Sequence, residues 1–307
     1  MNHPNHFLGL KLLSRDQIEE ILDRASFYRT SLDNSNKITK SCIGKNVINL
    51  FFENSTRTRV SFELAEKIIG MNAVNFSNDG SSFSKGESLL DTIKNLNAMK
   101  FDCYVVRHSV PGIPKLISQN VEGNVINAGD GAAEHPTQGL LDIMSLQRNF
   151  KRIKGLRICI VGDISHSRVA MSNIFGLRTL GAKVSVCGPR SFIPKNIEAL
   201  GVEVYDDIDQ AIKEHDAINV LRVQLERDAG SLLPSLQEYS KFYGITMKRI
   251  SLNPKIKILH PGPMNINVEI DYESSVSRNS LIFDQVTNGL SIRLAIFDLL
   301  SSNKNLK

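Results

Sequence analysis

Short apolar segments alternate with segments of helical period along most of the chain. In the first such unit, an apolar, β-rich run at residues 46–52 is followed by residues 55–69, which have the period of a helix. This helix carries apolar side chains on one face, Val60, Leu64 and Ile68, and Gly70 is well placed to end it. The pattern therefore predicts a strand, a short turn and a helix.

The same alternation continues in both halves of the 307-residue chain, which is typical of βαβ units with a mainly parallel sheet. Strands are predicted at residues 73–76, 103–107, 124–128, 157–161, 183–187, 202–205, 217–221 and 256–259, and helices at 88–99, from about 136, at 168–180, 208–215 and about 289–300. A basic, glycine-containing link at residues 148–155 separates the two series. We therefore expect an α/β protein with two doubly wound parallel-sheet domains, residues 1–147 and 148–288, with a C-terminal helix at about 289–307 completing the first.

The composition, with 41% apolar and 22% charged residues, is that of an ordinary globular protein. Its four cysteines are scattered without a CxxC pair, and three of them lie in the apolar runs. Buried free thiols are therefore expected, rather than a metal or redox site.

Residues 1–21 contain no uninterrupted apolar stretch, so neither a signal peptide nor a membrane anchor is expected, and a cytoplasmic location follows. The net charge of +5 raises the question of nucleic acid. However, Lys and Arg are dispersed, Trp is absent, and no basic run is interleaved with aromatic residues. Small anionic substrates account for the charge equally well.

The strongest local feature is Ser55-Thr56-Arg57-Thr58-Arg59, where the first strand gives way to its helix. Backbone N–H groups at a helix start lack partners, and the helix dipole adds partial positive charge, so an anion is favoured there. Hydroxyls and a guanidinium group would complete a phosphate cradle. The alternative is an ordinary N-cap with solvated arginines.

Two further segments of the first half bring suitable groups to strand ends. Arg107 and His108 follow the apolar run of their strand, where open α/β sheets bind ligands. Pro136 suits the first helical position, which leaves His135 and Gln138 able to point into the same crevice. His135 is then a candidate donor to a developing oxyanion, although a single Arg is more often a surface residue and a single His more often structural.

The second half repeats the strand-to-helix arrangement at residues 162–168, but without the GxGxxG spacing, so NAD binding is rejected. Arg168 and Arg222, the latter followed by Gln224, place two guanidinium groups at the mouth of the second sheet. Two such groups are what a dicarboxylate needs, although surface arginines are the alternative.

Together these segments resemble the aspartate and ornithine carbamoyltransferase family over nearly the whole chain. The matching segments are FENSTRTRVSFELA at residues 52–65, SKGESLLDT at 84–92, VVRH at 105–108, NAGDGAAEHPTQGLLD at 127–142, IVGDISHSRVA at 160–170, LRVQLER at 221–227, LHPGP at 259–263 and QVTNGLSIR at 285–293. The resemblance implies a transferase with its active site in the cleft between the two domains, without a metal or cofactor.

The acceptor follows from the second domain. Ornithine enzymes carry a cysteine in an HCLP segment and an SMG loop, whereas here the equivalent segments are HPGP at residues 260–263 and LRVQ at 221–224. The resemblance thus implies transfer of the carbamoyl group of carbamoyl phosphate to L-aspartate. This reaction gives N-carbamoyl-L-aspartate and phosphate, an early step of de novo pyrimidine (UMP) biosynthesis.

The resemblance also assigns roles to individual residues. Those implied to hold the phosphate are Ser55, Thr56, Arg57 and Thr58; those implied to polarise the carbonyl oxygen are Thr58, Arg107 and His135; those implied to hold or orient the carbamoyl group are Gln138, Gly262 and Pro263; and those implied to hold aspartate are Lys85, Arg168, Arg222 and Gln224. Ser82 and Lys85, in the polar loop at residues 77–87, would enter the neighbouring subunit's site, which implies a homotrimer.

One departure concerns the loop after HPGPMN, where many relatives have Arg-Gly and this chain has Ile266-Asn267. Whether regulatory chains or a dihydroorotase associate with the trimer is left open by the sequence. Two alternative functions were weighed: a carbamoyltransferase acting on another amino acid, such as ornithine or an acylated relative, and a catalytically silent partner that kept the fold.

Overall fold

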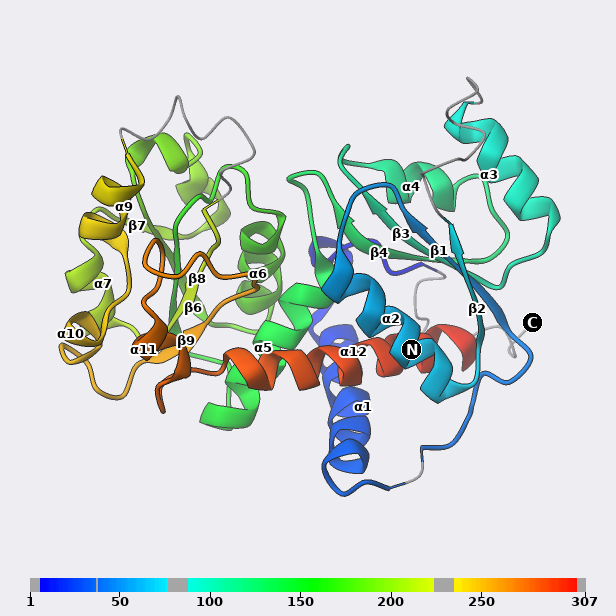
Figure 1. Ribbon diagram of the computed structural model, residues 1–307, viewed down its shortest axis with the longest axis horizontal. Coiled ribbons are helices and arrows are strands. Elements are labelled where there is room, and N and C mark those ends of the chain that lie inside the picture. Colours follow the sequence, from blue (N-terminus) through cyan, green and yellow to red (C-terminus); the bar gives the residue numbers. More distant parts are fainter. Residues whose placement is uncertain (1–5, 37, 77–87, 224–234, 303–307) are drawn as a thin grey trace. The chain divides into compact units, whose positions relative to one another are not determined.

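The computed structural model describes residues 6–36, 38–76, 88–223 and 235–302 (Figure 1). The chain divides into two compact units, one formed by Met1–Leu140 with Thr287–Lys307 and the other by Leu141–Val286. The boundaries of these compact units fall within two helices, α5 (Pro136–Phe150) and α12 (Ile282–Ser302).

The first unit contains a parallel sheet with the strand order β2-β1-β3-β4. Its strands are β1 (Asn46–Phe51), β2 (Asn72–Phe76), β3 (Cys103–His108) and β4 (Asn124–Asp130), and its helices besides parts of α5 and α12 are η1 (Leu10–Leu12), α1 (Arg15–Asp33), α2 (Thr56–Ile69), α3 (Leu89–Ala98) and α4 (Ile113–Ser118). The chain runs from β1 to β2 on one side and then returns to β3 on the other. The ends of β1 and β3 thus flank the point where the strand order reverses, which is where open α/β sheets bind ligands.

The second unit contains a parallel sheet with the order β7-β6-β5-β8-β9. Its strands are β5 (Arg157–Val161), β6 (Lys183–Cys187), β7 (Glu203–Tyr205), β8 (Ala217–Val220) and β9 (Lys257–Leu259), and its shorter helices are α6 (Arg168–Thr179), η3 (Arg190–Phe192), η4 (Ile197–Leu200), α7 (Ile208–Glu214), α9 (Leu236–Tyr243), α10 (Met247–Ile250) and α11 (Tyr272–Val276). Here the order reverses between β5 and β8. The prediction of two parallel-sheet α/β domains is confirmed.

Helix α2 begins and ends close to where the sequence predicts, and Gly70 closes it in the left-handed conformation with a φ of 89°. However, the apolar stripe that marks this helix in the sequence is not the face it buries. Its buried residues are Phe62, Ala65, Glu66 and Ile69, while Val60 and Leu64 are 53% and 45% exposed. Phe62 packs edge-on against Phe297 of α12, with the ring centroids 6.0 Å apart.

Two helices differ from the pattern-based prediction. Helix α12 begins at Ile282 rather than near Gly289, because Leu281 and Ile282 are themselves buried and the apolar surface extends further toward the N-terminus. Helix α1 has no counterpart in the prediction, since its buried positions are separated by charged residues; it starts with a capping box between Ser14 and Gln17.

The four cysteines are free and buried, as predicted: Cys42, Cys103, Cys159 and Cys187. Within the described residues, none of the helices combines the length and the apolar character that a membrane span requires.

A buried carboxyl group lies between α2 and the sheet. Glu66 has no solvent exposure, and the Nδ2 of Asn49 on β1 donates to its Oε2 at 3.0 Å. Its Oε1 and the Oδ1 of Asn49 have no hydrogen-bond partner among the described residues. Burial raises the pKa of Glu66 to about 7, and the charge of Glu63 acts in the same direction. Burial thus favours the protonated form of Glu66, which carries an O–H donor.

This burial should make stability depend on pH. Between the ordinary pKa of 4.5 and about 7, the folded state keeps a proton that the unfolded state loses, so the unfolding free energy falls as pH rises through this range. The upper limit of the loss is about 3 kcal/mol. We expect Glu66→Gln to gain up to this amount over the wild type between pH 5 and pH 8 in urea unfolding, whereas Glu63→Gln should not. Parallel pH profiles for Glu66→Gln and the wild type would contradict this assignment.

Candidate active site

The start of α2 is open to an anion. Ser55 is the N-cap residue, but its side chain makes no capping hydrogen bond, and the first turn contains no acidic residue. Thr56 and Arg57 are exposed, while Ser55 and Thr58 are half-buried. The unpaired amides of the first turn, the helix dipole and these side chains together favour a phosphate group. The Nε of Arg59 lies 3.4 Å from Glu63 Oε1 on the next turn.

Arg107 joins the ends of β1, β3 and β4. Its Nη1 donates to Thr58 Oγ1 at 3.4 Å and to the carbonyl oxygen of Ala128 at 3.2 Å, and its Nε lies 2.7 Å from Glu53 Oε1. The structure thus brings Thr58 and Arg107 together, as the sequence predicts. It also holds the guanidinium group in place by a carboxylate that the sequence analysis did not single out.

A second guanidinium group lies near Arg107. Arg293 of α12 is 4% exposed and stands over the ring of Phe62, 4.8 Å from its centroid. Burial, followed by the positive charge of Arg107, lowers the pKa of Arg293 to about 10. Arg293 remains charged at neutral pH and adds to the positive potential at this end of the first sheet.

His135 and Gln138 lie where β4 leads into α5, and both are buried. The His135 carbonyl oxygen accepts from the Gln138 and Gly139 N–H groups, and Thr137 Oγ1 is 3.5 Å from His135 Nδ1. Helix α5 begins at Pro136, as predicted. The preceding acidic residues are structural, since Asp130 accepts from Gly112 N and Glu134 accepts from Leu10 N at 2.7 Å.

In the second unit, Arg168 is the first residue of α6, and Ser167 Oγ caps this helix by accepting from Ala170 N at 3.1 Å. The loop from β5 is fixed by Asp163, whose carboxylate contacts the His166 backbone and ring nitrogens. Arg222 lies two residues beyond the end of β8, which pairs with β5. Arg168 and Arg222 therefore leave adjacent strands at the point where the order of this sheet reverses.

The loop after β9 lies beside the loop after β8. Asn265 Nδ2 donates to the carbonyl oxygen of Val223 at 2.9 Å, and the Gly262 N–H donates to His260 Nδ1 at 2.8 Å. Gly262 has a φ of 62°, a conformation that favours glycine, and Pro263 is exposed. At the departure from many relatives, Asn267 has a φ of 66°, so asparagine stands in for glycine at a left-handed position that it tolerates well.

Three residues of the predicted site, Ser82, Lys85 and Gln224, lie outside the described residues. The sequence analysis missed Glu53 and Arg293. The sequence does contain a signal for Glu53: it is an acidic residue two positions before Ser55, at the start of a segment that otherwise suits anions. Arg293 gave no local signal, because it lies within an apolar helix far away in sequence.

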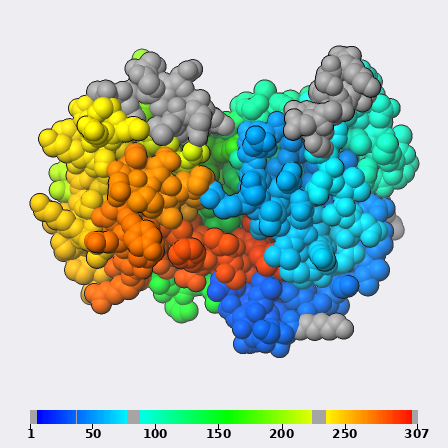
Figure 2. Space-filling model, in the orientation of Figure 1, coloured from blue at the N-terminus to red at the C-terminus, as the bar shows by residue number. Residues whose placement is uncertain are grey.

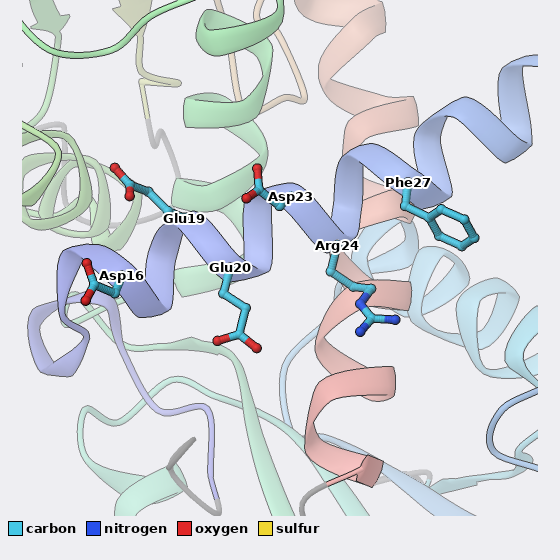
Figure 3. A pocket seen from close by; sticks show the side chains of 6 residues that line it. All are labelled: Asp16, Glu19, Glu20, Asp23, Arg24 and Phe27. Atoms are coloured by element: carbon cyan, nitrogen blue, oxygen red, sulfur yellow. The ribbon is translucent and has the colours of Figure 1, made fainter. Parts of the chain in front are cut away.

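A hollow of about 680 Å³ lies along α1, away from these residues. It is lined by Asp16, Glu19, Glu20, Asp23, Arg24 and Phe27 (Figure 3). Four of these six side chains are acidic, so the hollow repels anions and none of the predicted site residues lies in it.

Comparison with known proteins identifies the family of this chain. The family model for the aspartate/ornithine carbamoyltransferase carbamoyl-P binding domain matches residues 5–148, and the model for the Asp/Orn binding domain matches residues 154–300. The chain belongs to the aspartate/ornithine carbamoyltransferase family. The two models meet at residues 148–154, within the link at which the sequence analysis separates two series of strands and helices.

Members of this family from several bacteria are similar to the chain over nearly its whole length. An aspartate carbamoyltransferase catalytic subunit from Gemmatimonas aurantiaca is 50% identical over 97% of this chain and 93% of the relative. One from Cytophaga hutchinsonii is 47% identical over 97% of this chain and 98% of the relative.

Solved structures of this family also match. The catalytic subunit of M. jannaschii aspartate transcarbamoylase has a TM-score of 0.86 and 32% identity over 99% of this chain and 100% of that chain. Aspartate transcarbamoylase from Trypanosoma cruzi, in complex with carbamoyl phosphate and aspartate, has a TM-score of 0.86 and 28% identity over 96% of both chains.

Proposed function

We propose that this protein transfers the carbamoyl group of carbamoyl phosphate to the amine of L-aspartate, in an early step of pyrimidine biosynthesis. The observation that carries the proposal is the pair of cationic strand ends. One is the Arg57, Thr58 and Arg107 group at the reversal point of the first sheet, and the other is Arg168 with Arg222 at that of the second. The relatives named as aspartate carbamoyltransferases, and the neighbour bound to carbamoyl phosphate and aspartate, support the same substrates.

In this proposal, the first unit binds carbamoyl phosphate. The start of α2, with Ser55, Thr56 and Arg57, holds the phosphate group, whose oxygens match both the helix-start amides and a guanidinium fork. Thr58, Arg107 and His135 donate to the carbonyl oxygen, and Gln138 accepts from the carbamoyl nitrogen. Glu53 keeps Arg107 in position for this role.

The second unit binds aspartate in this proposal. Two guanidinium groups that leave adjacent strands, Arg168 and Arg222, suit the two carboxylates, and Gln224 and the neighbouring chain's Lys85 would add further contacts. Gly262 and Pro263 would orient the carbamoyl group. The cationic loops after β5 and β8 favour an acceptor that carries negative charge. They would repel the cationic side chain of ornithine.

The deprotonated amine of aspartate then attacks the carbonyl carbon, negative charge collects on the carbonyl oxygen, and phosphate leaves with the bonding electrons. Two anions repel each other in water, so much of the rate enhancement comes from holding them in contact. The remainder comes from donors placed where the negative charge develops.

The proposal is tested by product analysis. Purified protein is incubated with carbamoyl phosphate and, separately, aspartate, ornithine or an N-acylated ornithine, and the carbamoylated product is identified by mass spectrometry. N-carbamoyl-L-aspartate is expected only with aspartate. Carbamoylation of ornithine would support the alternative acceptor. A protein that neither turns over nor tightly binds either substrate would be catalytically silent.

We also propose that the protein assembles as a homotrimer in the cytoplasm. Four buried free thiols fit a reducing compartment.

For the assembly, the exposed apolar residues Val60 and Leu64 of α2 and Val74 of the edge strand β2 form a surface suited to a second chain. Residues 56–76 form part of the molecular surface in Figure 2.

A charge on this surface should separate the subunits. We expect Leu64→Glu to shift the protein from trimer to monomer in analytical ultracentrifugation, and to lower turnover at least tenfold because Ser82 and Lys85 would no longer reach a neighbouring site. Phe283→Glu, at an apolar residue of α12 that is 70% exposed against 45% for Leu64, serves as the control and should stay trimeric. A fully active monomer of Leu64→Glu would refute the shared site.

A further inference from the structure

We propose that two buried carboxylates, Asp142 and Glu269, are positioning residues that hold the three substrate-binding segments of the second unit in one arrangement. These segments are the start of α6 with Arg168, the end of β8 with Arg222, and the loop after β9 with Gly262 and Pro263. The inference rests on the proposed function, because these segments are assigned to aspartate and to the carbamoyl group there. Neither carboxylate is itself a candidate ligand of the substrates.

Asp142 of α5 lies at the centre of three amide side chains. It has no solvent exposure, and its Oδ2 accepts from Asn173 Nδ2 at 2.7 Å and from Asn219 Nδ2 at 3.0 Å. Its Oδ1 accepts from Gln285 Nε2 at 2.6 Å. Asn173 belongs to α6 and Asn219 to β8, so one carboxylate ties together the helix that starts at Arg168 and the strand that ends before Arg222.

Gln285 extends this network to the third segment. Its Oε1 accepts from the backbone N–H of His260 at 3.0 Å, directly after β9. Its other amide atom is the one that donates to Asp142. A fixed amide of Gln285 thus sets the distance between Asp142 and the beginning of the loop that contains Gly262.

Glu269 fixes the rest of that loop through His260. The Gly262 N–H donates to His260 Nδ1 at 2.8 Å, so this nitrogen carries a lone pair and the ring proton of the neutral imidazole is on Nε2. Nε2 lies 3.2 Å from Glu269 Oε1, which also accepts from Asn265 N at 2.6 Å. A carboxylate that orients a histidine determines its tautomer, here the one that lets Nδ1 hold Gly262.

The network also closes between the second and third segments. Asn265, whose N–H is held by Glu269, donates through Nδ2 to the carbonyl oxygen of Val223, the residue after Arg222. Val223 has no solvent exposure, so water does not compete for this contact. Each of the three segments is therefore bonded to at least one of the two carboxylates, directly or through one amide side chain.

The arrangement is kept at a cost in hydrogen bonding. Among the described residues, the Oδ1 atoms of Asn173 and Asn219 and the Oε2 of Glu269 are buried without a hydrogen-bond partner. Unsatisfied buried acceptors are unfavourable, and an apolar core of the same shape would avoid them. Retaining them suits a network that specifies position, because the side-chain amides of Asn173, Asn219 and Gln285 all donate to the single carboxylate of Asp142.

The conservative and truncated variants should behave differently. Glu269→Gln keeps an oxygen that accepts from His260 and Asn265 and places its NH2 at the position of Oε2, whereas Glu269→Ala removes the acceptor. Asp142→Asn keeps one acceptor oxygen but points an NH2 group toward amide donors. We expect the KM for aspartate to rise roughly tenfold or more in Glu269→Ala and Asp142→Asn. The KM for carbamoyl phosphate should rise less, by about threefold at most, because the first unit holds the phosphate group in the proposed function. Glu269→Gln should restore most of the affinity for aspartate.

Ser185→Ala is the matched control. Ser185 of β6 is 2% exposed and its hydroxyl is 2.9 Å from His215 Nε2. Among the described residues, its side chain hydrogen-bonds to His215 rather than to any of the three segments. This variant should lose stability to urea without a change in the KM for aspartate. Equal changes of the KM for aspartate in the control and in the network variants, at matched unfolding free energies, would overturn the proposal, as would equal changes of both KM values.

A second measurement does not need turnover. Hydrogen exchange at the Gly262 and Asn265 amides should be roughly tenfold faster in Glu269→Ala than in the wild type and unchanged in Ser185→Ala. Nitrogen NMR of His260 should show the proton on Nε2 in the wild type. If the wild type fails to carbamoylate aspartate but these amides respond as expected, the proposed function fails and the network stands. If exchange is unchanged, the network itself is refuted.

Discussion

Replacing Arg57 by alanine should lower kcat/KM for carbamoyl phosphate by a factor of about 10² to 10³, the usual loss when a donor to developing charge is removed. Arg57 lies in the first turn of α2, exposed, where helix-start amides already favour an anion. Its guanidinium group would add two parallel hydrogen bonds to phosphate oxygens that the amides cannot replace. Steady-state kinetics with carbamoyl phosphate varied at saturating aspartate measures the effect.

The control for this prediction lies two residues further along the same helix. Arg59 is equally exposed, but its guanidinium group is ion-paired with Glu63, so Arg59→Ala should keep kcat/KM within about threefold of the wild type. Both variants should unfold at the wild-type urea concentration, because neither side chain is buried. Similar losses in the two variants would show that the general positive charge of the helix, and not a phosphate contact of Arg57, is responsible.

Replacing Arg222 by alanine should raise the KM for aspartate by about 10²-fold, while the KM for carbamoyl phosphate changes little. A charge-assisted, bidentate contact to a carboxylate is worth about 1.5–3 kcal/mol, which corresponds to a factor of roughly 10 to 150 in affinity. The effect should be seen in initial rates with aspartate varied, and in the binding of succinate as an unreactive dicarboxylate.

Arg157 offers a control at the opposite end of the same sheet. It is the first residue of β5, and its Nη2 contacts Glu214 and Tyr205 rather than the ligand end. Arg157→Ala should cost some stability but leave the KM for aspartate unchanged. If Arg222→Ala bound aspartate as well as the wild type does, the assignment of the cationic ends of β5 and β8 to the acceptor would be wrong.

Much of the fold follows from local patterns. Strands β1, β5 and β6 are short, mostly apolar runs, because strands of a parallel sheet are buried on both faces, and such runs are easily located. Helix α1 was missed for the opposite reason, since its buried residues are diluted by charged ones. The last helix was predicted too short because glycine at 289 resembles a boundary, while its burial from Ile282 onward overrides that signal.

The periodicity of residues 55–69 correctly predicted a helix, but it did not show which face of that helix is buried. The stripe of Val60 and Leu64 is as apolar as the buried face, and nothing local tells a face that packs on the sheet from one that awaits a second chain. The buried face contains Glu66, which no hydrophobic pattern would place there. Only the pairing of Glu66 with Asn49, distant in sequence, makes that burial tolerable.

Candidate site residues could be named from the sequence where their chemistry lies within one short segment, as at residues 55–59 and 135–138. The residues that contact and support them could not, because their partners come from elsewhere in the chain. Glu53 acquires a role only when β3 brings Arg107 beside it, and Arg293 only when α12 packs on Phe62. Such roles depend on tertiary contacts that a linear pattern does not contain.

Helix α2 has a further consequence. The first two turns of α2 would be ordered both by an anion at residues 56–58 and by a neighbouring chain packed on Val60 and Leu64. Binding of either one reduces the conformational entropy that this segment loses when the other binds. Reciprocity then requires carbamoyl phosphate to strengthen subunit association by the same factor by which association strengthens its binding. Dilution alone would weaken substrate affinity in such a protein.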